Sequence, residues 1–433
     1  MQILYSYLIS LIIGTLTLCL GVYQLVQCDF SITTGYGIAR ILLSLSLCFI
    51  GLFIGLSQLF ISILPIKKRW IMIPLETDYC GPIIKDKIDA NYAYQLYSFF
   101  KEGNGKGLLC KRDVFRIVEE ANVLLQNKDG LVKVTIEPNE HITVVGDLHG
   151  QFYDLCNLFQ QNGLPSATNK YIFNGDLVDR GVFGIEIVLT LYSFLIAFPQ
   201  SLFINRGNHE TYDVNYSYGF LTEVQSKYDQ ETFIEVAGSL RWLPYCHLIN
   251  NSVFIVHGGL PPTPLEIDKI NQLQRGDDPE DGSIESELLW NDPQAAKGNS
   301  PSYRGIGHVF GPDVTQEFLN LNHLDLIIRS HEMKMNGYEW NIENKLMTIF
   351  SAPNYCGTVG NKGAYVLLSF DENTKPITKI IQFDSVIAPH ITLSKEPKLH
   401  EFEDIEIDVE TVWNNVAPLL ACAFSLFAII NEL

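Results

Sequence analysis

Six short polar blocks follow one another in a fixed order through the middle of this chain of 433 residues. They are GDLHG at 146–150, GDLVDRG at 175–181, RGNHE at 206–210, HGG at 257–259, RSHE at 329–332 and SAPNYC at 351–356. Five of them end an apolar run typical of a β-strand and carry Asp, Asn or His at its tip. Any one block is a weak signal, but their joint order predicts one rim where oxygen and nitrogen ligands meet divalent metals.

The residue types in these blocks predict two cations. Asp147 and His149 stand two positions apart between glycines, which let the backbone turn so that both side chains face one point. Asp176 ends the next apolar run and is suited to bridge two metals about 3.5–4 Å apart, as in phosphoester displacement. Such a mixed oxygen and nitrogen set suits Mn, Fe or Zn better than Ca or Mg. The predicted ligands are Asp147, His149, Asp176, Asn208, His257 and His331.

Phosphate binding and proton transfer are predicted from neighbouring residues. Arg180 and Arg206 lie in the same loops, and a guanidinium binds phosphate through two parallel hydrogen bonds. His209 follows a predicted ligand directly and is a candidate general acid. Asp179 could orient its ring and raise its pKa. These roles together predict hydrolysis by hydroxide formed on two metals.

The remainder of the middle region predicts an α/β domain. Amphipathic helices are expected at 87–102 and 112–126. The acidic segment 275–287 is expected to be a solvated loop with no role of its own. Strands are expected at 142–146, 171–174, 201–205, 252–256, 324–328, 346–350, 363–370 and 377–383.

Taken together, the six blocks resemble the phosphoprotein phosphatase family of serine/threonine phosphatases, closest to its protein phosphatase 5 branch. The likeness runs from about Tyr79 to about His390. It implies a calcineurin-like metallophosphoesterase fold, with a central β-sandwich flanked by helices and two divalent ions, Mn²⁺ in vitro and an Fe/Zn or Mn pair in cells. It also implies direct attack of hydroxide on phosphoserine or phosphothreonine, with no phosphoenzyme.

The resemblance further implies residue roles. Asp147, His149 and Asp176 would hold the first metal. The second would be held by Asp176, Asn208, His257 and His331. Phosphate would be bound by Arg180, Asn208, His209, Arg304 and Tyr355. Asp179 and His209 would form the proton-donating pair, and Tyr355 would lie where natural toxin inhibitors bind. Asp292 matches a family motif position whose role is less certain.

The first 66 residues predict a membrane anchor where the protein phosphatase 5 branch carries a tetratricopeptide domain. Residues 3–26 and 41–66 contain no charged side chain, and each stretch is long enough to span about 30 Å of hydrocarbon. Lys67, Lys68 and Arg69 follow directly, which places this end and the catalytic domain in the cytosol. A cleaved signal peptide over 1–27 is the alternative.

These observations divide the chain into helices at 1–27 and 41–66 with a link at 28–40, a juxtamembrane linker at 67–83, a catalytic domain at 84–390 that opens with helices in 84–128, and a tail at 391–433. The apolar stretch 416–430 could dock on the catalytic domain, lie on the membrane or cross it, and docking or surface association is favoured. An autoinhibitory tail remains open.

Net charge and cysteine content limit the kinds of partner and the compartment that fit this sequence. The net charge is −19 and no basic stripe occurs, which argues against nucleic acid. The nine dispersed cysteines include no CxxC pair and fit a reducing compartment. Expected partners are phosphoprotein substrates and the lipid bilayer. Alternatives are a metallophosphoesterase for small phosphoesters or nucleotides, or a scaffold that only binds phosphoproteins.

Overall fold

The computed structural model describes residues 69–76, 79–391 and 393. The predicted anchor at 1–66 and nearly all of the tail from 394 onward lie outside these residues. Within the described part, no helix is both long and apolar enough to cross a bilayer.

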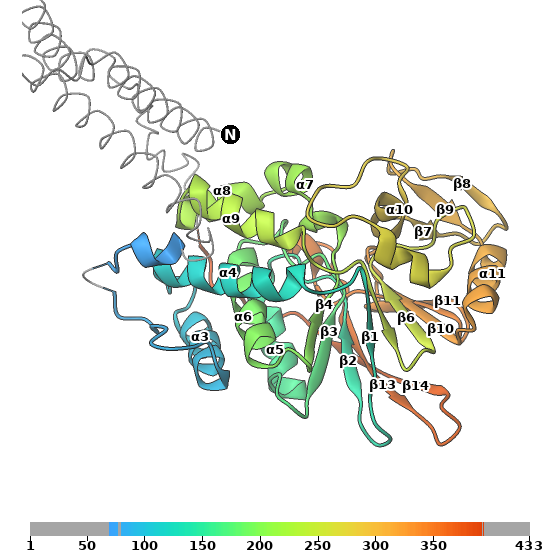
Figure 1. Ribbon diagram of the computed structural model, residues 1–433, viewed down its shortest axis with the longest axis horizontal. Coiled ribbons are helices and arrows are strands. Elements are labelled where there is room, and N and C mark those ends of the chain that lie inside the picture. The colour runs from blue at the N-terminus through green and yellow to red at the C-terminus, as the bar shows by residue number, and fades with distance from the viewer. Residues whose placement is uncertain (1–68, 77–78, 392, 394–433) are drawn as a thin grey trace, which may run out of the picture. The chain divides into compact units, whose positions relative to one another are not determined.

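Two β-sheets form the centre of the domain (Figure 1). The six-stranded sheet has the order β1 (Leu131–Val134), β5 (Cys246–Ile249), β6 (Val253–Val256), β10 (Leu326–Arg329), β12 (Leu346–Ile349), β11 (Tyr338–Ile342). The five-stranded sheet has the order β14 (Pro376–Phe383), β13 (Gly363–Phe370), β2 (Ile142–Val145), β3 (Lys170–Phe173), β4 (Leu202–Ile204). A small third sheet contains β7 (Asp292–Pro293), β9 (His308–Phe310) and β8 (Asn299–Pro301).

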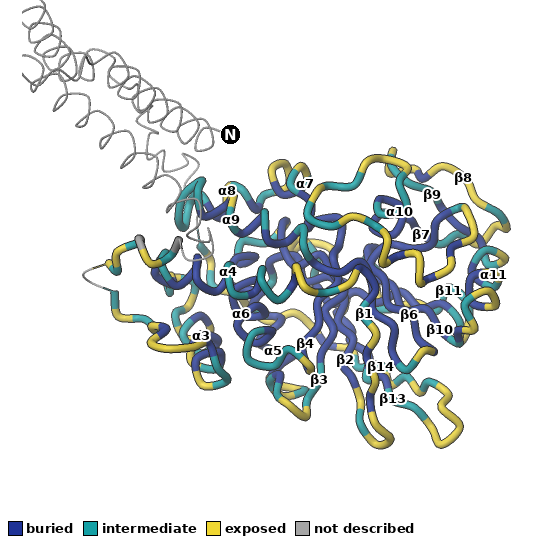
Figure 2. Tube along the Cα trace, in the orientation of Figure 1, coloured by how far each residue is buried: buried dark blue, intermediate teal, exposed yellow. Residues whose placement is uncertain are grey.

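The two large sheets pack face to face around an apolar core. Val144 and Ile172 of the five-stranded sheet share one buried cluster with Ile255, Ile328 and Met347 of the six-stranded sheet. The central strands β2, β6 and β10 are buried along their whole length (Figure 2), and apart from Thr143 and Arg329 their side chains are apolar. The predicted central sandwich is therefore present.

Helices cover the outer faces of both sheets. The five-stranded sheet is covered by α3 (Ala90–Glu102), α4 (Lys111–Gln126), α5 (Phe152–Asn162), α6 (Gly184–Ala197), α8 (Phe220–Lys227) and α9 (Gln230–Leu240). Helix α6 is apolar on nearly every side because helices surround it. The six-stranded sheet is covered by η3 (Ile267–Gln272), α10 (Ile284–Trp290) and α11 (Pro312–Asn322). Short pieces are η1 (Arg69–Met72), η2 (Asn208–Glu210), α7 (Tyr212–Ser217) and η4 (Tyr355–Gly357).

Local chemistry sets several helix ends. The Asp89 side chain accepts a hydrogen bond from the Tyr92 backbone N–H at 3.1 Å and begins α3. Asp229 does the same for α9 through Thr232 at 2.8 Å. Pro312 occupies the first turn of α11, where no backbone donor is needed.

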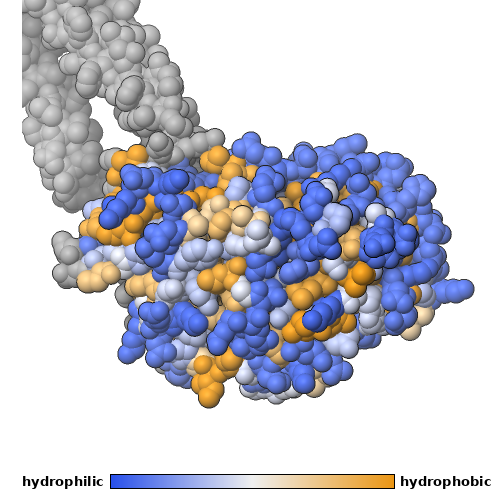
Figure 3. Space-filling view, turned by 90° about the horizontal axis from the view of Figure 1, so that it is seen from below, coloured by the Kyte–Doolittle hydropathy of each residue, from blue (hydrophilic) through white to orange (hydrophobic). Residues whose placement is uncertain are grey.

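The face shown in Figure 3 is mostly polar, with apolar patches that stay separate.

All eight predicted strands occur, with ends shifted by two residues at most, and 363–370 matches β13 fully. The strands that were not predicted are β1, β5 and β11 of the six-stranded sheet and the three short strands β7, β8 and β9. The important consequence is positional: β2, β3, β6 and β10 each end where a polar block begins. An isolated bridge between Asp147 and Phe350 brings the ends of β2 and β12 together at the same edge.

Candidate active site

The predicted metal ligands meet where the two sheets abut. Asp147 and His149 follow β2, Asp176 follows β3, and Asn208 follows β4, so the five-stranded sheet supplies these four side chains. The other two come from the six-stranded sheet: His257 follows β6 and His331 follows β10. All six are at most 7% exposed. The site is therefore shared between the sheets, with four side chains from the five-stranded sheet and two from the six-stranded sheet.

Unusual backbone geometry aims these side chains at one point. The left-handed region is occupied by His149 (φ 44°), Asp176 (φ 52°), Asp179 (φ 68°), Arg180 (φ 67°) and His331 (φ 70°). Non-glycine residues rarely adopt such angles, and they concentrate at sites where function requires them. Gly207 permits a close approach, because a Cβ there would lie 2.3 Å from Asp176 Oδ1.

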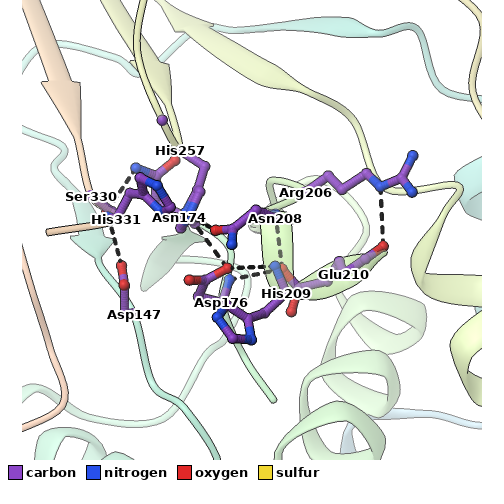
Figure 4. Close-up of polar contacts among 12 residues, drawn as sticks. Asp147, Asn174, Asp176, Arg206, Asn208, His209, Glu210, His257, Ser330 and His331 are labelled. Carbon is purple, nitrogen blue, oxygen red and sulfur yellow. Dashed lines mark hydrogen bonds and ion pairs between the residues drawn. The ribbon is translucent and has the colours of Figure 1, made fainter. Parts of the chain in front are cut away.

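Asp176 sits between two groups of ligand atoms (Figure 4). Its Oδ2 is 3.5 Å from His149 Nε2, and its Oδ1 is 3.3 Å from His257 Nε2. On the second side, His257 Nε2 is 3.0 Å from Asn208 Oδ1 and 3.2 Å from His331 Nδ1. On the first side, Asp147 Oδ2 lies 3.6 Å from His149 Nε2. One carboxylate oxygen facing each group is the arrangement of a bridging ligand.

Two of the imidazoles are oriented for metal binding by their other nitrogen. His149 Nδ1 donates to the Val178 carbonyl at 3.0 Å, and His257 Nδ1 donates to the Asn174 carbonyl at 2.7 Å. Each bond fixes the tautomer that leaves the Nε2 lone pair facing the site. This is the usual second contact of a metal-binding histidine.

Two buried atoms test whether metals fit here. Among the described residues, Asp147 Oδ2 and His331 Nε2 have no hydrogen-bond partner. A buried carboxylate oxygen or imidazole nitrogen without a partner is costly. Divalent cations would satisfy them, and the oxygen and nitrogen donor set suits Mn, Fe or Zn. The residues present therefore fit a two-metal site.

The ionisation of Asp176 and His331 also suits ligation. Burial opposes charge on Asp176, but His257, His209 and His149 outweigh burial and hold the pKa of Asp176 well below its ordinary value. Burial, aided by Arg304 and His257, holds the pKa of His331 well below its ordinary value, so its imidazole stays neutral. A charged carboxylate and a neutral imidazole are the forms that bind metals.

His209 and Asp179 form a close pair beside the cluster. His209 Nδ1 is 2.7 Å from Asp179 Oδ2. Asp179 also accepts from the Phe220 backbone at 2.8 Å and from the Asn215 amide at 3.3 Å, which fixes its carboxylate. His209 lies near the first group, since its ligand atom is within 4.8 Å of those of His149 and Asp176. The sequence predicted Asp147 as the third ligand beside His149 and Asp176. Asp147 Oδ2 does lie 3.6 Å from His149 Nε2, but the three atoms within 4.8 Å of one another are those of His149, Asp176 and His209.

Two exposed arginines border the cluster. The Arg180 guanidinium lies 4.5 Å from the centre of the Tyr218 ring. Arg304 donates through Nε to Asp292 at 2.5 Å and through a terminal nitrogen to the His331 carbonyl at 3.3 Å. Asp292 also accepts from buried Arg329 at 2.8 Å. Asp292, whose role the sequence left uncertain, thus holds Arg304 next to a ligand loop.

The prediction that Arg206 binds phosphate is wrong. Its side chain is fully buried and points away from the cluster (Figure 4). It donates to the Glu210 carbonyl at 3.1 Å, to the Asp277 carbonyl at 2.9 Å and to Asp278 Oδ1 at 2.9 Å. The prediction that segment 275–287 has no role is wrong for the same reason, because it anchors this arginine.

Tyr355 lies over the first group from η4. Its ring centre is 5.1 Å from that of His149 and 5.2 Å from that of Phe350. Burial is the main cause that raises the pKa of its hydroxyl, so this group is a neutral hydrogen-bonding group at physiological pH. Tyr355 therefore lies beside a predicted metal ligand, and its contact with substrate stays a prediction.

Sequence reasoning missed the residues that support the cluster. Glu210 accepts backbone hydrogen bonds from Asp176 at 2.8 Å, Leu177 at 2.9 Å and Gly207 at 2.8 Å. Its place at the end of the RGNHE block was the only indication in the sequence. Tyr218 lies outside every block and gave none.

Known proteins are similar to this chain in sequence and fold. The family model described as calcineurin-like phosphoesterase matches residues 140–335. Serine/threonine-protein phosphatase 5 of Homo sapiens is 42% identical over 319 residues, which cover 73% of this chain and 63% of the relative. Serine/threonine-protein phosphatase T of Trypanosoma brucei brucei is 42% identical over 306 residues, covering 70% of this chain and 64% of that protein.

One solved structure is matched over nearly its whole length. It is a protein serine/threonine phosphatase from Saccharomyces cerevisiae, described as similar to human phosphatase PP5. It shares 39% identity with a TM-score of 0.64, and the match covers 68% of this chain and 95% of that one. By contrast, this chain spans 58–63% of the length of the first curated relatives it matches.

The sandwich, its strand-end ligands and the bridging carboxylate define a two-metal phosphoesterase of the calcineurin-like class. Within that class, the chain belongs to the phosphoprotein phosphatase family of serine/threonine phosphatases, with relatives among the phosphatase 5 and phosphatase T proteins.

Proposed function

We propose that this chain hydrolyses phosphoserine and phosphothreonine in proteins. The observation that carries the proposal is the position of Asp176, whose two oxygens face two separate groups of ligand atoms. The relatives named above are serine/threonine-protein phosphatases, and they support the substrate class. Bound divalent cations would supply Lewis acidity toward phosphate and would acidify water near neutral pH. Asp147, His149 and Asp176 would hold the first cation, and Asn208, His257 and His331 would complete the second site with Asp176.

The protein groups have separate tasks in this proposal. Arg180 and Arg304 bind the phosphate oxygens, for which their planar guanidinium groups are suited. Tyr355 closes one side of the phosphate site and excludes water there. His209 gives its proton to the oxygen of the departing serine or threonine. Asp179, 2.7 Å from His209 Nδ1, orients the imidazole toward the leaving oxygen.

Phosphate release from a phosphoserine peptide by the full chain, with and without Mn²⁺, tests this function. Release should require Mn²⁺ and disappear in Asp176→Asn, which keeps the shape of the side chain but removes its charge. Strong turnover of nucleotides or small phosphoesters together with poor turnover of the peptide would favour the smaller-substrate alternative. Metal-free peptide binding with no turnover would favour a scaffold.

We also propose that residues 1–66 hold the enzyme at a membrane with the catalytic domain in the cytosol. The proposal is supported by the two uncharged stretches 3–26 and 41–66 and by the basic residues 67–69 that follow them. Alkaline carbonate extraction of cell membranes, with protease treatment of intact vesicles, tests it. The chain should stay with the membrane, and the catalytic domain should be cut from the cytosolic side. Release by carbonate would contradict the anchor.

A further inference from the structure

A continuous chain of buried polar side chains lies behind the metal site. His247, Asn205, Asn174 and Ser330 are each at most 1% exposed. His247 Nδ1 donates to Asn205 Oδ1 at 2.6 Å. The Asn205 amide donates in turn to Asn174 Oδ1 at 2.7 Å and to the Ile255 carbonyl at 3.0 Å. Polar groups at such depth are costly unless they are satisfied, and here each link satisfies the next.

Asn174 connects this chain to both imidazoles of the second metal group (Figure 4). Its amide donates to the Val256 carbonyl at 2.8 Å and to Ser330 Oγ at 2.8 Å. These two residues immediately precede His257 and His331. The Asn174 backbone carbonyl also accepts from His257 Nδ1 at 2.7 Å. A single residue therefore fixes the tautomer of one ligand and contacts the residue that precedes each of the two ligands.

This series of hydrogen-bonded side chains links one sheet to the other. Asn174 and Asn205 follow β3 and β4 of the five-stranded sheet, whereas His247 lies on β5, and Val256 and Ser330 belong to the ends of β6 and β10 in the six-stranded sheet. The apolar core between the sheets is non-directional and would tolerate small shifts of one sheet over the other. Hydrogen bonds depend on distance and angle, so they can fix the alignment.

We propose that Asn174, Asn205 and His247 are positioning residues that align the imidazoles of one sheet with the carboxylate of the other for metal binding. Their effect is carried through His257 and His331, which must stay within reach of Asp176 across the sheet boundary. The inference concerns metal affinity and rests on the two-metal site. Partners of metal-binding histidines typically contribute about 10–100-fold to affinity.

Isothermal titration of the full chain with Mn²⁺ in detergent measures this affinity without relying on turnover. Asn174→Leu and Asn205→Leu keep the approximate volume and remove the hydrogen bonds. Each should weaken Mn²⁺ binding about 10–100-fold. Tyr192→Phe is the matched control, because it removes a buried hydrogen bond to Ser239, 3.1 Å long, between α6 and α9. It should leave Mn²⁺ affinity unchanged. Thermal unfolding without metal shows which variants are folded.

A conservative exchange separates positioning from packing. His247→Gln retains an N–H donor for Asn205, and it should bind Mn²⁺ more tightly than His247→Leu, which has none. Folded Asn174→Leu and Asn205→Leu proteins that bind Mn²⁺ as tightly as Tyr192→Phe would overturn the inference. If neither Asn174→Leu nor Asn205→Leu folds, the hydrogen-bonded side chains are needed for the fold as a whole and not for metal binding in particular. That result would also overturn the inference. Normal Mn²⁺ binding without peptide turnover would instead count against the proposed function alone.

Discussion

The guanidinium of Arg180 lies 4.5 Å from the ring centre of Tyr218, and the Tyr218 ring stands 5.5 Å from that of His209. The Arg180 backbone N–H also donates to the Tyr218 carbonyl at 3.3 Å. A residue outside every sequence block thus contacts both a proposed phosphate ligand and the proposed acid.

Replacing Tyr218 by Leu should weaken substrate binding. Removal of the ring loses a cation–π contact of about 0.5–1 kcal/mol, so KM for a phosphopeptide should rise about 2–5-fold, with kcat less affected. Tyr218→Phe should stay near the original values. Tyr216→Leu is the control, because Tyr216 is 59% exposed and lies in α7, which ends just before Tyr218. Equal effects at 216 and 218 would argue against positioning of Arg180.

The pairing of His209 with Asp179 predicts a dependence on the leaving group. Asp179→Asn keeps a hydrogen-bond acceptor for His209 but removes the carboxylate that pairs with the imidazole during proton transfer. The kcat for a phosphoserine peptide should fall about 10²–10⁴-fold. An aryl phosphate, whose leaving group departs without a proton, should lose much less. Equal losses on the two substrates would contradict general-acid catalysis.

Arg206 and Arg180 should respond differently to substitution by Ala. Arg206 is buried with Asp278 and backbone carbonyls, so Arg206→Ala should lower the free energy of unfolding by about 3–5 kcal/mol. Arg180 is exposed, so Arg180→Ala should leave that free energy nearly unchanged and raise KM instead. Denaturant titration and steady-state kinetics of both variants check the contrast. A reversed order would contradict the buried network.

Binding of Mn²⁺ should stabilise the folded chain. At a free concentration 100 times Kd, a single site adds about 2.7 kcal/mol, and chelation should remove this gain. The rise in Tm should disappear in Asp176→Asn. Asp268→Asn is the control, since its carboxylate is exposed and pairs only with exposed Lys133 among the described residues. A full Tm rise in Asp176→Asn would show that Asp176 does not bridge the metals.

His247 should make stability dependent on pH. Burial, with a smaller contribution from Lys128, lowers the pKa of His247 to about 3 in the folded chain. The unfolded chain takes up this proton below about pH 6.5, while the folded chain stays neutral, so acid favours unfolding. As the pH falls from 6.5 to 5, the loss of free energy of unfolding from this group should steepen to about 1.4 kcal/mol per pH unit. His247→Gln should show a correspondingly smaller loss in thermal unfolding over that range, and parallel curves would refute the assignment.

Much of the domain was predictable because its blocks begin where strands end. The apolar strands β2, β3 and β6 can be recognised from the sequence, and the predicted ligands Asp147, Asp176 and His257 follow them closely. By contrast, β11 has the mixed sequence YEWNI because it is an edge strand with only partly buried side chains. Strand β5 is a four-residue segment containing His247, and no alternation marks it.

The directions of side chains and the contacts between residues far apart in the sequence were harder to predict. Arg206 shares a block with Asn208, yet the loop after β4 directs it into the interior toward Asp278. Proximity in sequence therefore suggested the wrong partner. Asn205 and His247 lie 42 residues apart, and only the packing of two sheets brings them into contact.

The left-handed conformations of the site also bear on how this protein would respond to selection for heat resistance. Arg180, at φ 67°, holds a conformation that glycine adopts without strain, whereas other residues lose about 1–2 kcal/mol. Arg180→Gly should therefore tend to increase thermal stability while it removes a phosphate ligand. A screen for stability alone would favour replacement of Arg180 in this loop. Thermostable variants of this enzyme should therefore be selected by turnover and melting temperature together.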